Sequence, residues 1–162
     1  MKCEIVKGDD MSLEDYFRKM EALDYIEIDA GFLEPKMHPE SDLTIPTIAA
    51  IQQFGNESNN IPARPFLTDG ALHASKEIPK HWMTVFRDYL LRGKGLGAFE
   101  PIAKATREGI AQAIALQRYK PLSPVTIKIR QDRGNMSTHI LIDTAHLINS
   151  IESDVKRGRK KK

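Results

Sequence analysis

Five histidines are the residues of this chain best suited to hold a metal ion or to move a proton near neutral pH. They lie at scattered positions: His38, His73, His81, His139 and His146. None stands with a cysteine or a carboxylate in a metal-ligand pattern such as HExxH or CxxC. His73 and His81 would lie about two helical turns apart, but Pro79 comes between them. The sequence therefore predicts no metal site.

Patterns typical of covalent catalysis or nucleotide binding are also missing from the sequence. It contains no GxSxG, no phosphate loop and no dinucleotide-binding fingerprint. A Ser-His-Asp triad is assembled in space, so spacing alone does not exclude one. The stretch GKGLG, residues 93–97, follows an expected helix instead of a strand, which favours a helix-ending turn. We therefore predict no catalytic residue, no cofactor and no enzymatic activity.

The stretch FGNESNNIPARPFL, residues 54–67, is stiff without carrying recognisable chemistry. Pro62 and Pro65 each fix their own φ and favour extended geometry in the preceding residue. A stiff loop that bears Arg64 and Phe66 suits a protein interface, because order before binding lowers the entropic cost of association. Alternatively, Phe66 packs into the domain's own core while Arg64 caps a helix or pairs internally. The residues alone favour neither.

Positive charge gathers at the end of the chain. The net charge is +2, yet six of the 24 basic residues are Lys156, Arg157, Arg159, Lys160, Lys161 and Lys162. No acid follows Asp154, so residues 1–155 carry a net charge of −4. These six residues are candidates for contact with DNA or an acidic partner. The plainer interpretation is a solvated terminus, so residues 156–162 are expected to form a flexible tail.

Length and composition indicate one soluble domain, because 162 residues with 41% hydrophobic and 28% charged side chains can bury a core. The longest apolar runs are far shorter than the roughly 18 residues of a membrane span. The first residues, MKCEIVKGDD, turn acidic where a signal peptide would be apolar. We therefore expect synthesis in the cytoplasm and no membrane partner. Cys3 has no cysteine to pair with and is expected to be a small buried apolar residue.

Periodicity predicts the elements of the first half of the chain. Residues 12–23 place apolar side chains at helical spacing after a capping box of Ser12 and Asp15. Residues 25–32, YIEIDAGF, alternate as a half-buried strand, for which KCEIV near the start is a candidate partner. Residues 45–55, IPTIAAIQQFG, fit a short helix that ends before the glycine.

The second half is expected to be mainly helical. A helix from Pro65 is expected to be interrupted around Gly70, and a separate helix is expected to begin at Pro79. The clearest helical pattern covers residues 99–117, where apolar side chains recur every three or four positions.

Two later segments are harder to assign. Residues 121–130, PLSPVTIKIR, fit a helix capped by Ser123 or an alternating strand. Asp143 is the expected N-cap of a helix within residues 141–153, and SIESDVKR could leave that helix as a strand. The predicted class is α+β: a single domain over residues 1–155, with a small, mostly antiparallel sheet flanked by several helices.

Three motifs, in this order, resemble those of a family of tailed-phage morphogenesis proteins, the neck or tail-completion group, which includes minor tail proteins. They are IAAIQQFGNESNNIPARPFLTDG, PLSPVTIKIR and LIDTAHLINSI, and the resemblance covers roughly residues 24–152. Two positions depart from the family pattern. Gln53 stands where an acid is usual, which removes any salt bridge from that position. Ala145 replaces a glycine, and alanine resists positive φ.

The resemblance implies a non-enzymatic virion component at the head–tail junction, with no cofactor. Such proteins form a ring, often of six copies, between the head-side connector or head-completion protein and the tail tube or tail terminator protein. The family fold is a small sheet flanked by helices, and it favours a helix at residues 121–130. A tail terminator, or a nucleic-acid-binding module that uses the basic tail, is the alternative.

The stiff loop is then expected to lie at or beside a contact between subunits. Its candidate interface residues are Phe54, Gly55, Pro62, Arg64, Pro65 and Phe66. Because phage DNA passes through the neck, the basic tail is a candidate contact for DNA as well as for an acidic partner.

Overall fold

The structure, a computed structural model, describes residues 11–143 and 145–158. Its helices and strands follow the order α1 (Leu13–Leu23), β1 (Ile26–Gly31), α2 (Ile45–Phe54), α3 (Phe66–Leu90), α4 (Glu100–Ala115), α5 (Pro124–Asp132), α6 (His146–Asn149) and β2 (Glu152–Arg157). The chain forms a single α+β domain with helices around an antiparallel sheet, as the sequence predicted. The candidate strand KCEIV, with Cys3, lies outside the described residues.

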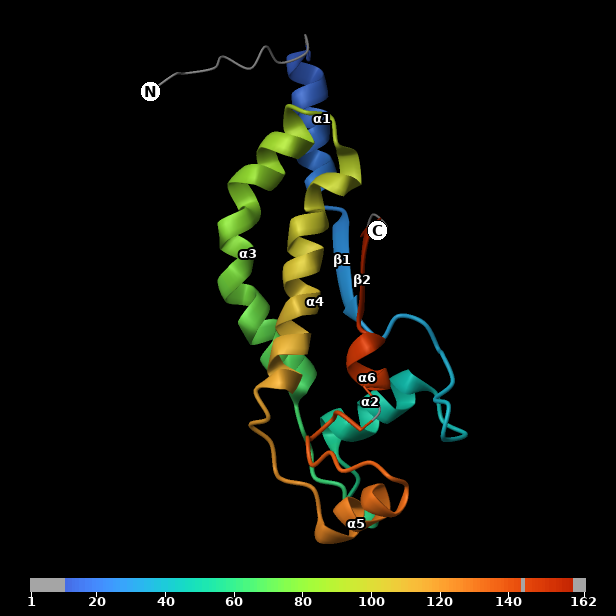
Figure 1. Ribbon diagram of the computed structural model, residues 1–162. Coiled ribbons are helices and arrows are strands. Elements are labelled where there is room, and N and C mark those ends of the chain that lie inside the picture. Colours follow the sequence, from blue (N-terminus) through green and yellow to red (C-terminus); the bar gives the residue numbers. More distant parts are fainter. Residues whose placement is uncertain (1–10, 144, 159–162) are drawn as a thin grey trace.

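Helices α3 and α4 form an antiparallel hairpin that carries the rest of the fold (Figure 1). Their backbones touch where Gly70 of α3 faces Gly109 and Ile110 of α4. A Cβ on Gly109 would lie 2.5 Å from the Gly70 carbonyl oxygen, and a Cβ on Gly70 would lie 2.6 Å from Ile110 Cα. Glycine is needed at both positions because no side chain fits between the two helices.

Helix α3 is continuous, so the predicted interruption around Gly70 and the predicted separate helix from Pro79 are wrong. A proline inside a helix removes one backbone hydrogen bond and costs about 3 kcal/mol. The helix persists because it buries apolar side chains on both sides of Pro79, Phe66 before it and Val85 and Tyr89 after it. Figure 1 shows α3 curved instead of broken, as expected of a proline-containing helix.

Strands β1 and β2 pair antiparallel along α4, which lies between them and α3 (Figure 1). The register places Ile28 opposite Val155, and both pack against buried side chains of the hairpin. The prediction of strands in these two segments is therefore confirmed, although burial alternates only in part along each. Strand β2 includes Lys156 and Arg157, the first two residues of the tail that was expected to be flexible.

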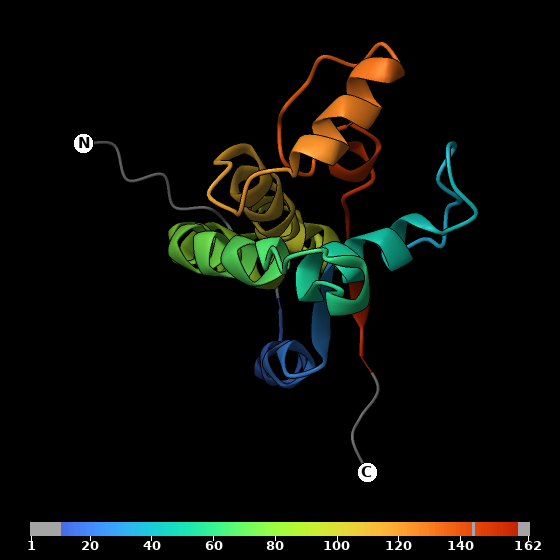
Figure 2. The same ribbon diagram turned by 90° about the horizontal axis from the view of Figure 1, so that it is seen from below.

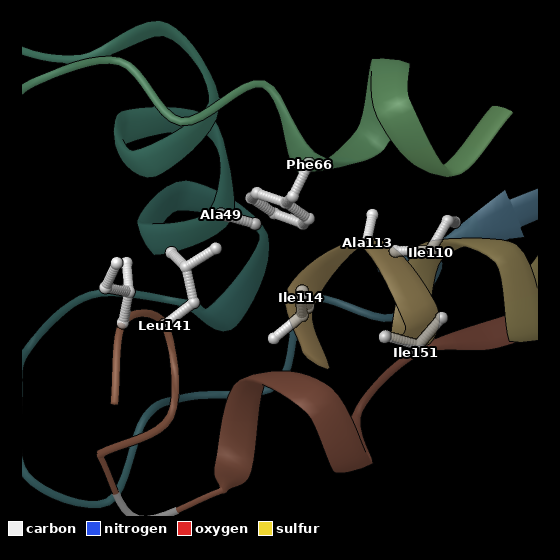
Figure 3. Close-up of a cluster of buried hydrophobic side chains, with 8 residues drawn as sticks. Ala49, Phe66, Ile110, Ala113, Ile114, Leu141 and Ile151 are labelled. Carbon is white, nitrogen blue, oxygen red and sulfur yellow. The ribbon is translucent and has the colours of Figure 1, made fainter. Parts of the chain in front are cut away.

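Buried hydrophobic side chains form two clusters, one toward each end of the hairpin. The cluster nearer α1 consists of Val85, Tyr89, Leu90, Ala98, Phe99 and Ile102. The other lies where α2 and α6 approach α4 (Figure 3) and consists of Ala49, Phe66, Ile110, Ala113, Ile114, Ile140, Leu141 and Ile151. Because this second cluster joins segments far apart in sequence, it fixes the end of the molecule that holds the candidate site.

Local capping fixes the starts of the first two helices; the Ser12 cap was predicted, and the Thr44 cap was not. Ser12 Oγ accepts a hydrogen bond from Asp15 N at 3.1 Å. Thr44 Oγ1 accepts one from Thr47 N at 3.3 Å. Gly55, with a φ of 77°, ends α2. No helix in the described ranges is both long and apolar enough to cross a membrane.

Residues 124–132 form helix α5, the first of the two predicted alternatives for this segment. Ser123 Oγ accepts from Thr126 N at 3.1 Å and so caps the helix. Seen from below, α5 and α2 extend away from the hairpin in different directions (Figure 2). Residues of both helices line the candidate site.

Asp143 does not cap the last helix, so that prediction is wrong. Helix α6 is a single turn whose N-cap position is Ala145, with a φ of 59°. The carboxylate of Asp143 instead lies 3.2 Å from Arg130 Nε. A buried arginine needs a nearby negative charge, and this need outweighs the weaker benefit of a cap on one helical turn.

Candidate functional site

Backbone hydrogen bonds, together with the two prolines, hold the loop between α2 and α3 in one shape. Asn56 and Ile61 exchange backbone bonds of 2.8 and 2.9 Å around a 3₁₀ turn, Glu57–Asn59. A Cβ on Gly55 would lie 2.7 Å from Ala63 N, so the residue at this position must be glycine. The stiffness predicted from the prolines is therefore a property of the whole loop.

Arg64 points back into its own fold, which settles the direction that the sequence left open. Its backbone N–H donates to Gln52 O at 2.8 Å, and its Nη1 donates to the side-chain oxygen of Gln52. Arg64 is only 5% exposed. Phe66, two residues later, is fully buried in the second cluster. For these two residues, the alternative of internal packing is the one that the structure contains.

The candidate interface residues fall into three groups. Phe54 and Pro65 are exposed, Gly55 and Pro62 are half-buried, and Arg64 and Phe66 are buried. Phe54 stands out because 78% of its surface is exposed. That the loop contacts another subunit stays a prediction, and Phe54 is the residue most available for such a contact.

Gln53, which stands where the resembled family has an acid, caps helix α3. Its Oε1 accepts from Leu67 N at 2.9 Å, and its Nε2 donates to Thr68 Oγ1 at 3.0 Å. Pro65, at the N-cap position, gives no side-chain cap. Gln53 therefore satisfies one of the first backbone N–H groups of α3, which would otherwise be unpaired. An acid could accept the same bond, which explains why both residue types fit here.

Arg130 of α5 holds the chain that follows it. Its Nη1 donates to the carbonyl oxygens of Ser137 at 3.2 Å, His139 at 2.9 Å and Ile142 at 3.4 Å. The side chain is buried. Nothing in the sequence singles out Arg130, although it lies in PLSPVTIKIR, because a basic residue near the end of a helix is ordinarily solvated. Only the three carbonyl groups reveal its role.

A cleft of about 860 Å³ opens beside Arg64 and Arg130. Its lining comes from residues 38–41, helix α2, the stiff loop, residues 120–133 and residues 141–147. Most of these lining residues belong to the three motifs that resemble the phage family, and His38, Glu40, Ser41, Ile45, Lys120 and Arg133 lie outside them. Apolar side chains such as Ile48, Leu122 and Leu147 make up much of the wall. The motifs are therefore neighbours in space, although residues 71–120 separate the first from the second and residues 131–140 separate the second from the third.

The cleft is electropositive at its base. Burial, and then the nearby charge of Arg130, lower the pKa of the Arg64 guanidinium. Nε of Arg64 is buried and has no hydrogen-bond acceptor among the described residues. Nε of Arg130 lies 3.2 Å from Asp143 Oδ1 but lacks hydrogen-bond geometry. Of the two buried arginines, Arg130 thus has a carboxylate beside it, whereas Arg64 has none among the described residues, an arrangement suited to binding a further anion.

Two of the scattered histidines meet at this cleft. The rings of His38 and His146 lie edge to face, with centroids 5.5 Å apart, and both residues line the cleft. Within residues 11–143 and 145–158, no group of three or more His, Cys, Asp or Glu side chains could hold a metal ion. The histidines therefore contribute to the wall of the cleft through ring packing.

The basic tail begins inside the fold. Lys156 lies in β2 and forms an ion pair with Asp29 of β1, and Arg157 ends the strand. Arg159, Lys160, Lys161 and Lys162 lie outside the described residues. The structure brings neither Lys156 nor Arg157 to the cleft.

Comparisons with protein-family models, with curated proteins and with solved structures find no match to this chain. The resemblance to phage assembly proteins therefore rests on the three sequence motifs.

Proposed function

We propose that this chain is a structural, non-enzymatic protein of a tailed-phage virion. Copies of it form a ring at the head–tail junction, between the head-side connector and the tail tube or its terminator. The observation that carries the proposal is the meeting of the three family-like motifs around one cleft. Motifs that share a site in space are expected to serve one task, whereas a chance likeness would scatter over the molecule.

Exposed apolar side chains supply the surfaces that a ring needs. Helix α1 buries none of its residues, and Leu13 and Phe17 are 76% and 62% exposed. Met83 of α3, on a different element, and Phe54 of the stiff loop are also exposed. A closed ring requires two different surfaces on each subunit, one for each neighbour. Large exposed apolar side chains are typical of such contacts.

Electron microscopy of particles assembled without this protein tests the proposal. The genome that encodes the chain is altered by an early stop codon, and the protein is supplied from a plasmid as the control. We expect filled heads beside complete but unattached tails, and normal particles when the plasmid is present.

Other outcomes of the same experiment separate the alternatives. Tails of abnormal length would contradict a joining role and indicate a tail terminator. Complete particles of normal form would contradict any structural role at the junction. A nucleic-acid-binding module that uses the basic tail would then be the better account.

A further inference from the structure

The cleft contains more positive charge than its own carboxylates balance. Lysine and arginine contribute four of its lining residues, Lys120, Arg64, Arg130 and Arg133, whereas Glu40 and Asp143 are its acids. Glu40 lies 3.7 Å from Arg133 at the rim, and Asp143 lies 3.2 Å from Arg130. Among the described residues, no carboxylate forms an ion pair with Arg64 or Lys120.

Arg64 is the residue with the largest unmet demand for an anion. It is buried, and its Nε has no acceptor among the described residues. Its Nη1 donates to the side-chain oxygen of Gln52, which is a neutral acceptor. A buried guanidinium without a counter-ion is costly, and so is a buried donor left without an acceptor. Arg64, with the already paired Arg130 near it in the same cleft, favours an anionic ligand over an empty site.

The walls indicate which anion fits. Apolar side chains, among them Ile45, Ile61 and Leu122, line the cleft around the arginines. A nucleic-acid backbone presents one charge at each phosphate and prefers a continuous basic groove. A peptide with apolar side chains beside an acid matches both parts of this lining, because a carboxylate pairs with guanidinium groups while its neighbours bury apolar surface.

We propose that the cleft binds an acidic side chain of a partner protein, presented on a short peptide segment with apolar neighbours. The carboxylate is received by Arg64 and Arg130, and Lys120 attracts it at the rim. The binding rests on the geometry of the cleft. The identification of the partner as a neighbouring protein of the head–tail junction rests on the function proposed above.

Fluorescence anisotropy with the purified full chain tests the binding by itself. The probe is a fluorescein-labelled peptide, Val-Asp-Ile-Glu-Val, with blocked ends, and its neutral counterpart is Val-Asn-Ile-Gln-Val. We expect the acidic peptide to bind about tenfold or more tightly than the neutral one, since charge-assisted hydrogen bonds are lost with the carboxylates. Equal affinities, or no binding of the acidic peptide, would overturn the proposal.

Matched variants show whether binding occurs at the cleft. Arg64→Gln should weaken the acidic peptide about tenfold, whereas Arg118→Gln, which removes an exposed arginine outside the lining, should leave affinity unchanged. Circular dichroism checks that both variants fold. If Arg64→Gln does not fold, Lys120→Glu decides, because Lys120 is exposed and its charge reversal should weaken binding about threefold.

The control for Lys120→Glu is Lys128→Glu, which makes the same charge change on the exposed surface of α5 outside the lining. Equal effects of these two variants would overturn the proposal, because they would indicate attraction by overall charge alone. A labelled single-stranded oligothymidylate completes the set. The proposal would be overturned if this probe bound as tightly as the peptide and if Arg64→Gln weakened both equally. The cleft would then be assigned to nucleic acid. If particles assembled without the protein are defective but the purified chain does not bind the acidic peptide, the proposed structural function stands and the proposed binding site is rejected.

Discussion

Ala145 has a φ of 59°, in the left-handed region, directly before the single turn of α6. This conformation costs an alanine about 1–2 kcal/mol, because its Cβ approaches the carbonyl oxygen that follows. The resembled phage family has glycine at the corresponding position, and glycine adopts this conformation without strain. The chain therefore has a strained residue beside its candidate site, close to the carboxylate of Asp143.

Replacing this residue should stabilise the protein. Ala145→Gly should raise the free energy of unfolding by about 0.5–1 kcal/mol, the strain relieved less the extra freedom of glycine in the unfolded chain. Urea denaturation measures the change. As a control, Ala71→Gly on the exposed side of α3 should lower the free energy of unfolding by about 1 kcal/mol. If Ala145→Gly lowered the free energy of unfolding, as the control does, the result would contradict backbone strain at Ala145.

At the scale of single residues, the sequence could indicate that a loop is rigid but not in which direction its side chains point. Pro62 and Pro65 showed that Arg64 sits in a stiff loop, yet its burial depends on Gln52 and on a cleft formed by segments far along the chain. Arg130 gave no signal, because its three carbonyl partners lie in an irregular segment without a pattern of its own.

At the scale of elements, the contact between α3 and α4 decides the structure of the hairpin. Gly70 suggested a break in α3 and instead allows the backbone of α4 to approach. Pro79 suggested a new helix and is instead accommodated in a curved one. In both cases packing between helices outweighs local preference. Helices α1 and α2 were predictable because their signals are local: the Ser12 cap for α1, and Pro46 and Gly55 at the two ends of α2.

Because the backbones of α3 and α4 are this close, we expect even a methyl group at position 109 to lower the stability of the protein. Gly109→Ala would raise helix propensity by about 1 kcal/mol, but its Cβ would overlap the Gly70 carbonyl, which lies 2.5 Å away. We expect a net loss of about 1–3 kcal/mol in the free energy of unfolding. The control is Gly97→Ala, because a Cβ there has nothing within 4 Å. Thermal denaturation that shows Gly109→Ala to be as stable as this control would contradict the proposed backbone contact.

At the scale of the whole molecule, the hairpin separates two kinds of surface. Helix α1 lies at one end with its apolar side chains exposed, whereas α2, α5 and α6 surround the electropositive cleft at the other end (Figure 1). Two different surfaces at opposite ends allow one copy to contact different neighbours. This division fits a ring component that must also dock onto the structures above and below it.

Cryo-electron microscopy of complete particles from the encoding genome tests the proposed function most directly, because it locates the protein in the virion. Mass spectrometry of the same particles establishes whether the chain is present. We predict a ring between connector and tail. Each subunit of the ring should show the curved α3 packed on α4, with the strands beside it. Particles that lack the chain, or a junction whose subunits do not fit this hairpin, would contradict it.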